Sequence, residues 1–337
     1  MKVGIRRILS IDGGGIKGAM PIAFLARDEE VTGQRIVDHF DLIAGTSTGG
    51  IIAIGLGLGV PAARVLDLYR NEGPGIFGAR TIDESTSKMG RIAGSLRNLM
   101  GRHARQAKQL FAPKHQPDML RSALQEVLGD RQLGESQTRL LIPAYLADRR
   151  TVYVFKTAHH PRLEIDHRAK AVDVALATAA APTYFPAHSL PSGARIIDGG
   201  IWANNPMGMA MVEAVGVLEW DPHAVRLLSL GCGDEVVVAD PETGIVQLGR
   251  GAIDLLMQGQ SFGSVGTAKL LAGEHNVYRI NPTVPKGLFS LDDTTKIDRL
   301  TGLGAECARE ALPLLRREFL TGHREAFTPC HGAKIAS

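Results

Sequence analysis

The stretch from Leu42 to Gly57, which reads LIAGTSTGGIIAIGLG, constrains the fold of this chain more than any other. An apolar run enters the five residues from Gly45 to Gly49, and an apolar, glycine-rich run leaves them. This pattern predicts a buried strand, a very tight turn and a buried helix, with Ser47 at the turn. The G-x-S-x-G spacing is typical of a nucleophile elbow, in which the glycines let strand and helix pass closely behind the serine. A small-residue loop without catalytic function has the same form, so the rest of the chain must decide.

Strands followed by glycine turns and helices recur along the 337 residues. The repeated order predicts an α/β fold with a mostly parallel central sheet and helices on both faces. No linker-like break in composition occurs, so we expect a single domain over 1–337, with core motifs at 8–233, an inserted cap at about 71–115 and C-terminal helices at about 246–320. The expected strands are 7–12, 40–46, 139–147, 151–157, 195–198, 225–230 and 276–280; the expected helices are about 19–30, 48–59, 60–70, 117–128, 172–181, one after 206, 246–272 and 296–320.

Composition excludes several classes of protein. A formal net charge of +3 is too small to indicate binding to a nucleic-acid polymer. The three cysteines, Cys232, Cys307 and Cys330, are odd in number and unpatterned, which predicts neither a disulfide framework nor a zinc site. The chain opens without signal-peptide architecture, and no apolar run reaches the roughly 20 residues that span a bilayer. We therefore expect a cytoplasmic protein whose contact with the inner membrane is peripheral.

The segment from 88 to 114 is basic and contains no acidic residue. Apolar residues recur in it at helical spacing, which predicts a basic amphipathic helix within the cap. Two interpretations stay open: a solvated helix docked on the body, or a cap over the serine that meets an anionic membrane or nucleotide. The candidates for such contacts are Arg97, Arg102 and Arg105.

Acyl transfer needs a nucleophile, a base and donors for the oxyanion, and Ser47 is the candidate nucleophile. Gly13, Gly14 and Gly15 end the first strand and open a helix, so their backbone N–H groups can turn toward one point. Loss of one such donor typically costs about 3–4 kcal/mol of transition-state stabilisation. The alternative is a non-catalytic nucleotide-binding protein, because the same glycines match a dinucleotide fingerprint.

That alternative requires an acidic residue at the end of the next strand. Asp38 and Asp41 lie at about the right distance along the chain, but they precede the second strand instead of ending it. The acidic residue that the fingerprint needs is therefore misplaced, which favours the catalytic interpretation.

The base is less obvious than the nucleophile. His159, His160 and His188 do not stand in recognisable catalytic turns. Asp198 ends a short apolar strand and precedes Gly199-Gly200, which would project its carboxylate from the end of the strand, although a plain turn has the same pattern. A carboxylate with a pKa of about 4 is a weak base for a serine hydroxyl unless it is desolvated or the oxyanion is strongly stabilised.

Three motifs in this order closely resemble the patatin-like phospholipases: DGGGIKG, GTSTG and DGG, together with AAPTYFP between the last two. The resemblance runs from about 8 to 233. It implies a three-layer sandwich with an inserted cap and hydrolysis of lipid acyl esters by a Ser47–Asp198 dyad without histidine, metal or organic cofactor. It also implies an oxyanion hole made by the N–H groups of Gly13, Gly14 and Gly15 with help from Thr48. The residues that support the motifs are Asp12, Lys17, Gly18, Gly45, Gly49, Gly199 and Gly200.

A finer resemblance rests on NEGPGIF at 71–77, the hairpin at 141–157 and WANNP at 202–206. These segments are similar to a bacterial branch that includes anti-phage phospholipase effectors switched on by cyclic oligonucleotides to degrade the host membrane. The partners so implied are a phospholipid membrane and a cyclic nucleotide, bound on the domain itself or between subunits of a homo-oligomer. Two departures are small: Lys17 replaces a common arginine, and Cys232 stands where threonine is expected and is interpreted as a packing residue.

Overall fold

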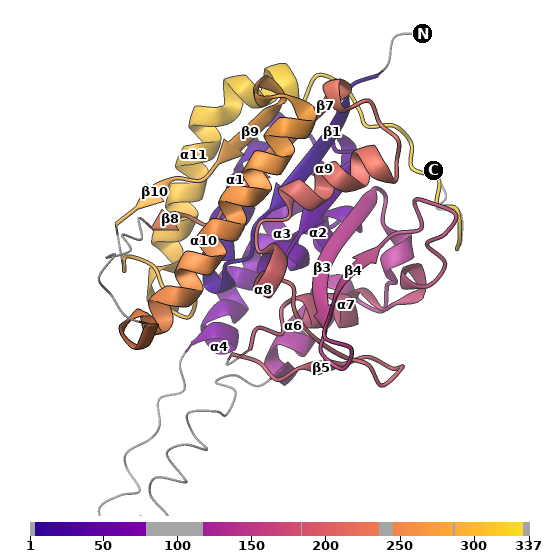
Figure 1. Ribbon diagram of the computed structural model, residues 1–337. Coiled ribbons are helices and arrows are strands. Elements are labelled where there is room, and N and C mark those ends of the chain that lie inside the picture. The colour runs from indigo at the N-terminus through magenta and orange to yellow at the C-terminus, as the bar shows by residue number, and fades with distance from the viewer. Residues whose placement is uncertain (1–3, 79–116, 183, 236–244, 286, 333–337) are drawn as a thin grey trace, which may run out of the picture.

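The computed structural model describes residues 4–78, 117–182, 184–235, 245–285 and 287–332, which build an α/β fold around an eight-stranded sheet (Figure 1). Five strands are parallel neighbours, in the order β3, β2, β1, β7 and β9. The other three are antiparallel: β4 and β6 each pair with β3, and β5 pairs with β6. The mostly parallel sheet is as expected. The strands are β1 (Arg6–Ile11), β2 (Leu42–Gly45), β3 (Arg139–Leu146), β4 (Thr151–Lys156), β5 (His188–Ser189), β6 (Arg195–Asp198), β7 (Val225–Leu230) and β9 (Val277–Ile280), with β8 (Asp234–Glu235) and β10 (Thr283–Val284) in a separate pair.

The sheet is split along one edge of β3, and this split positions the site. β2 pairs with the first part of β3 up to Leu141, and β6 pairs with its last part from Ala144. β4 pairs with β3 over both parts, so β2 and β6 share the opposite edge. Because β2 runs parallel to β3 and β6 runs antiparallel, the last residues of both strands, Gly45 and Asp198, approach each other end to end.

Alternation along the strands gives the sheet two buried faces. Ile43 and Leu140 pack into one apolar cluster, whereas Leu42, Ala44 and Leu141 pack into another. The first cluster is completed by α1, α2, α3, α6, α7 and α11, and the second by α9 and α10, which lie in front of the sheet in Figure 1. The three-layer arrangement with helices on both faces is therefore confirmed.

The long helices begin and end close to the expected residues. The predicted 60–70 helix differs, because it continues from α3 into a π-helical turn at Leu68–Glu72 and then α4. The helices are α1 (Ala19–Thr32), α2 (Thr48–Gly57), α3 (Ala62–Asp67), α4 (Gly73–Phe77), α6 (Pro117–Leu128), α7 (Ala171–Thr178), α8 (Gly200–Ala203), α9 (Met207–Gly216), α10 (Ile245–Ala272) and α11 (Ile297–Glu318).

Two predictions remain untested. The basic helix with Arg97, Arg102 and Arg105 lies outside the described residues, as does most of the predicted cap at 71–115. The single-domain organisation stays a prediction.

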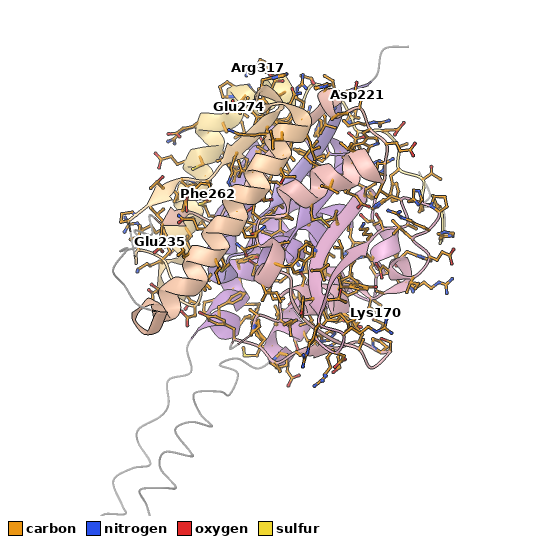
Figure 2. All side chains as sticks on the ribbon, viewed as in Figure 1. Lys170, Asp221, Glu235, Phe262, Glu274 and Arg317 are labelled. Atoms are coloured by element: carbon orange, nitrogen blue, oxygen red, sulfur yellow. The ribbon has the colours of Figure 1, made fainter. Side chains whose placement is uncertain are left out.

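The outer surface carries charged side chains around its periphery and several exposed apolar side chains. Lys170, Asp221, Glu274 and Arg317 mark the loops and helix ends in Figure 2, and Phe262 of α10 is 64% exposed. Among the described residues, no helix is both long and apolar enough to cross a bilayer.

Candidate active site

The predicted elbow forms where β2 meets α2. Ser47 has φ 55° and ψ −125°, a left-handed conformation that an L-residue adopts only at a cost of about 1–3 kcal/mol. A Cβ atom at Gly45 would overlap the Gly49 carbonyl oxygen, and one at Gly49 would overlap that of Ile11. Both glycines are therefore required for α2 to pass so close behind β2 and β1.

A hydroxyl that the sequence analysis missed holds the elbow in place. The Ser47 N–H donates to Thr178 Oγ1 over 3.0 Å, and Thr178 Oγ1 donates to the Pro143 carbonyl over 2.6 Å. Pro143 lies in the split between β2 and β6, so its carbonyl would otherwise lack a strand partner. The available signal was a polar residue at the end of an otherwise alanine-rich helix. Thr178 thus ties the nucleophile to the sheet.

The structure brings Ser47 and Asp198 together. Ser47 Oγ donates to Asp198 Oδ2 over 2.5 Å, and the Gly200 N–H donates to Asp198 Oδ1 over 2.6 Å. Ser47 is 8% and Asp198 4% exposed. A Cβ at Gly199 would overlap the Pro143 carbonyl oxygen, so glycine is needed for the close turn after β6.

Burial determines the proton affinity of this carboxyl group. It raises the pKa of Asp198 to about 6, against the opposing effect of the hydrogen bonds from Ser47 and Gly200. The pKa of a general base should lie near the working pH. Asp198 is thereby a stronger base than an exposed aspartate and is still ionised at neutral pH.

The glycine turn lies next to Ser47, but its three N–H groups are not equivalent. The Gly13 N–H donates to the Asn204 carbonyl over 3.0 Å, and Asn204 Nδ2 donates back to the Gly13 carbonyl over 3.2 Å. The Gly14 N–H donates to Thr48 Oγ1 over 3.2 Å. Gly15, with φ 56°, and Thr48 are the first residues of helical segments, where N–H groups have no partner within the helix.

Side chains of low exposure contact the glycine turn and hold it in place. Arg279 donates to both carboxylate oxygens of Asp12, over 2.6 and 3.2 Å. Cys232 lies under Gly14, and burial raises the pKa of its thiol to about 12, so it packs rather than reacts. Lys17 is half-buried in the 3-10 turn Gly15–Gly18. A Cβ at Gly18 would contact the Tyr69 ring, and the Tyr69 hydroxyl donates to the Thr48 carbonyl over 3.1 Å.

The three histidines considered as bases have other surroundings. His159 bonds Thr157 and Glu213, each over 2.9 Å. His188 lies 3.2 Å from Asp173, and the ring of His160 accepts from the Arg162 N–H. The hydroxyl of Ser47 is thus directed at a carboxylate and not at an imidazole.

The dinucleotide alternative finds no support in this geometry. The N–H groups of Gly13, Gly14 and Ile16 are all engaged within the protein, the last with the Leu291 carbonyl over 3.0 Å. Asp41 lies before β2, at the opposite end of the strand from Ser47, where it accepts the Arg7 N–H over 2.9 Å. A pyrophosphate would need several free donors and an acidic residue at the same edge of the sheet.

Comparison with known families and proteins gives consistent matches. A family model described as patatin-like phospholipase matches residues 9–211. A cGAMP-activated phospholipase of Pseudomonas aeruginosa is 37% identical over 225 residues, covering 66% of this chain and 61% of the relative. One from Vibrio cholerae is 33% identical over 251 residues, covering 70% and 67%. Patatin-like protein 2 of Arabidopsis thaliana is 33% identical over 230 residues, covering 61% and 52%.

Among solved structures, VipD from Legionella pneumophila matches with a TM-score of 0.46 and 12% identity, covering 92% of this chain and 67% of VipD. The matched part of this chain spans about three fifths of the Pseudomonas relative, at 61%.

Proposed function

The chain belongs to the patatin-like phospholipase family, and from that premise we propose that it hydrolyses acyl esters of membrane phospholipids through Ser47 and Asp198. The observation that carries the proposal is the 2.5 Å hydrogen bond between Ser47 Oγ and Asp198 Oδ2. It supplies a nucleophile already in contact with a base whose pKa burial has raised to about 6.

In the proposed reaction, Asp198 takes the hydroxyl proton as Ser47 Oγ attacks the ester carbonyl carbon. The N–H groups of Gly15 and Thr48 stabilise the oxyanion, with Gly14 contributing once its bond to Thr48 Oγ1 is exchanged. Asp198 then protonates the departing lysophospholipid oxygen, which leaves an acyl ester on Ser47. Asp198 next deprotonates a water molecule, which attacks the acyl ester. As the bond between the acyl carbon and Ser47 Oγ breaks, Asp198 returns the proton to Oγ and the fatty acid leaves. We therefore assign the oxyanion hole to the N–H groups of Gly15 and Thr48 and not to that of Gly13, which donates to the Asn204 carbonyl.

Hydrolysis of phospholipid vesicles by matched variants tests the dyad. Ser47→Ala and Asp198→Asn should each lower fatty-acid release by at least about 10³-fold, because removal of one member of a catalytic pair disables the unit. His188→Ala is the control and should retain activity, since its ring contacts Asp173. An active Asp198→Asn variant together with an inactive His188→Ala variant would refute the dyad.

A fluorophosphonate probe separates the enzyme from a non-catalytic nucleotide-binding protein. The probe phosphonylates activated serine hydroxyls, so the wild-type protein should be labelled at Ser47 and the Ser47→Ala variant should not. A folded wild-type protein that fails to react both without and with the cyclic nucleotides named below would favour the binding protein.

Regulation by a cyclic dinucleotide is part of the same proposal. Its support is that the Pseudomonas and Vibrio relatives are named cGAMP-activated phospholipases. The protein would then act in anti-phage defence, with low basal hydrolysis at the inner membrane until the nucleotide appears. Vesicle hydrolysis with a panel of cyclic di- and trinucleotides, including cGAMP, tests this step; full activity without nucleotide and no binding by calorimetry would reject it.

A further inference from the structure

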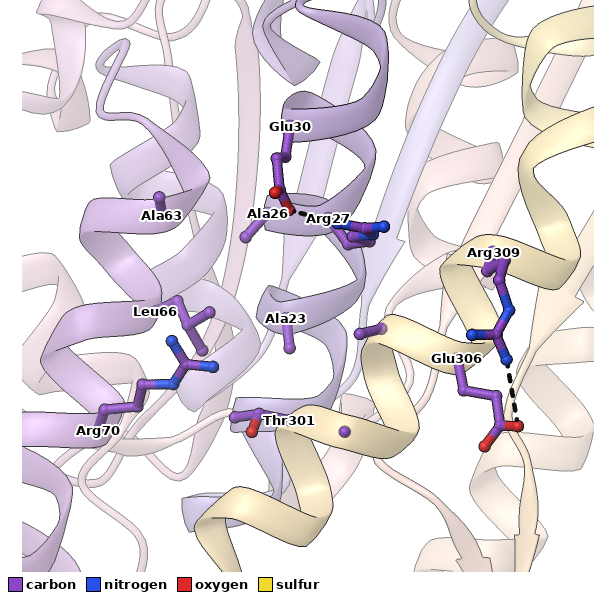
Figure 3. A pocket seen from close by; sticks show the side chains of 12 residues that line it. Ala23, Ala26, Arg27, Glu30, Ala63, Leu66, Arg70, Thr301, Glu306 and Arg309 are labelled. Atoms are coloured by element: carbon purple, nitrogen blue, oxygen red, sulfur yellow. Dashed lines mark hydrogen bonds and ion pairs between the residues drawn. The ribbon is translucent and has the colours of Figure 1, made fainter.

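A groove of about 740 Å³ opens between α1, α3 and α11, apart from the dyad (Figure 3). Its volume lies within the range of about 300–1,000 Å³ that is typical of small-molecule sites. The described residues that line the groove do not include any residue of the glycine turn, the elbow or the close turn after β6. The groove is therefore a second candidate ligand site on this molecule.

Three guanidinium groups border the groove, one from each wall, and the carboxylates of Glu30 and Glu306 line it beside two of them. Arg27 lies on α1, Arg70 on the π-helical turn and Arg309 on α11 (Figure 3). Arg27 pairs with Glu30 at 2.8 Å and Arg309 with Glu306 at 3.5 Å, while Arg70 makes no ion pair within the described part of the chain. Exposed pairs three residues apart are weak, so these guanidiniums can turn to a stronger partner. Planar guanidiniums bind phosphate oxygens through two hydrogen bonds.

The floor of the groove is apolar. It is formed by small residues on all three walls, and a Cβ at Gly302 would meet nothing within 4 Å. Such a surface leaves room for the face of a planar ring while the arginines stand at the rim. The small floor residues are Ala23, Ala26, Ala63, Gly302 and Ala305.

Arg70 adjoins a direct contact with the catalytic machinery. Its neighbour Tyr69 donates to the Thr48 carbonyl at the start of the nucleophile helix and packs against Gly18 at the end of the glycine turn. Both residues belong to the π-helical turn Leu68–Glu72. Such turns hold one extra residue and are frequent at functional sites. A change in the turn that moves Arg70 must also move Tyr69.

The other two walls, α1 and α11, are continuous with segments that form or contact the turn Gly15–Gly18. α1 begins at Ala19, directly after the turn Gly15–Gly18 that carries a proposed oxyanion donor. The segment before α11 supplies the Leu291 carbonyl, which accepts the Ile16 N–H over 3.0 Å. Each wall of the groove therefore continues along the chain into a segment that forms or contacts the glycine turn or the elbow.

We propose that this groove is the activator site, where the arginines bind the two phosphodiester groups of a cyclic dinucleotide and the purines lie on the alanine floor. Binding changes the positions of Tyr69 and of the turn Gly15–Gly18, and this change reaches Ser47. The identity of the ligand rests on the proposed function; the location rests on the cavity, its charges and its connections to the site.

The test measures cGAMP binding by calorimetry and vesicle hydrolysis against cGAMP concentration in full-length variants. Arg70→Ala and Arg309→Ala should each raise both the Kd and the half-activating concentration by about 10-fold or more, since each removes a charge-assisted contact to phosphate. Matched controls are Arg64→Ala on α3 and Arg317→Ala on α11, exposed arginines that do not line the groove. Tyr69→Phe should bind cGAMP with unchanged Kd but show reduced activation.

The outcomes separate the location from the function. If Arg70→Ala and Arg309→Ala bind and respond like the controls, the groove is refuted while nucleotide activation stands. If the wild-type protein hydrolyses vesicles but neither binds nor responds to cGAMP, both the activator and its site are refuted while the dyad stands. Recovery of full activity in the arginine variants at high cGAMP supports the groove, because only affinity is then impaired.

Discussion

Within the described residues, the carboxyl group of Asp198 is held in the interior by two donors, the Ser47 hydroxyl and the Gly200 N–H. Burial outweighs them and raises its pKa to about 6, compared with about 3.9 in an unfolded chain. Between these two values the native state binds more protons than the unfolded state. The contribution of Asp198 to stability is therefore present at low pH and is lost as pH rises from about 4 to 6.

The first prediction concerns this proton. Below pH 6, kcat/KM for a soluble ester should fall about tenfold per pH unit, because the base becomes protonated. Asp198→Asn should abolish activity and raise the free energy of unfolding by roughly 1–2 kcal/mol at pH 7.5, since the amide carries no buried charge. Denaturant titrations at pH 7.5 and 4.5 check this: most of the gain should be lost at pH 4.5, and a destabilised variant at pH 7.5 would contradict the buried-charge explanation.

The second prediction concerns Thr178, whose hydroxyl joins Ser47 to Pro143. Thr178→Val keeps the shape but leaves a buried N–H and a buried carbonyl without partners, at about 1–3 kcal/mol each. The elbow should loosen, so kcat and the rate of fluorophosphonate labelling should fall by at least 10-fold with little change in KM. Thr178→Ser retains the hydroxyl and should restore both rates. Unchanged labelling in a destabilised Thr178→Val would reduce Thr178 to a purely structural role.

Residue-level chemistry was only partly accessible from the sequence. The motifs singled out Ser47 and Asp198 because glycine turns and a strand end are visible as local patterns. Thr178 had no such pattern, since its role arises from a contact 131 positions away along the chain. The engagement of the Gly13 N–H with Asn204 likewise depends on how α8 packs on the turn, which no local rule specifies.

At the scale of elements, periodicity located the long helices and central strands, because burial on one or both faces leaves a clear hydrophobic pattern. It missed the break of the predicted 60–70 helix into α3 and the π-helical turn, because one extra residue in a helical turn leaves the hydrophobic period almost unchanged. The two-residue strands β5, β8 and β10 are too short to show any period.

The third prediction contrasts glycines in two long helices. A Cβ at Gly259 or Gly263 of α10 would meet nothing within 4 Å, whereas one at Gly304 of α11 would overlap the Met20 carbonyl of α1. Gly259→Ala and Gly263→Ala should each stabilise the protein by about 0.5–1 kcal/mol, because alanine is the better helix former. Gly304→Ala should destabilise it by about 1–3 kcal/mol through overpacking. Urea denaturation checks all three, and a stabilising Gly304→Ala would show that α1 and α11 can separate freely.

At the scale of the whole molecule, the segment after α11 crosses the ends of the strands opposite the active site. The Arg324 N–H donates to the Asp38 carbonyl over 2.7 Å, and the Cys330 N–H donates to the Ala158 carbonyl over 2.7 Å. Glu325 forms an ion pair with Arg6 at 2.5 Å. The sequence shows no periodicity here, because the segment is held by single contacts to residues far away along the chain.

The interior charges on this side depend on that segment. The Arg139 side chain is 12% exposed, and its guanidinium lies over the rings of Trp220 at 5.4 Å and Phe327 at 5.2 Å. Asp41 accepts from Arg6 at 3.3 Å and from the Glu325 N–H at 3.0 Å. Removal of the segment would leave these charges without part of their pairing and packing, which is costly in a desolvated setting.

The fourth prediction follows for a chain shortened after Gly322. Loss of Phe327 and of the pairing by Glu325 should lower the free energy of unfolding by on the order of 3–5 kcal/mol. Because the segment contacts the starts of β1 and β2, whereas Ser47 follows the end of β2, kcat/KM measured well below the melting temperature should change less than twofold. A chain shortened after Gly332, which keeps all the contacts of the segment named above, is the control. If the shorter chain lost activity while it remained folded, the starts of the strands would be coupled to the dyad through the sheet.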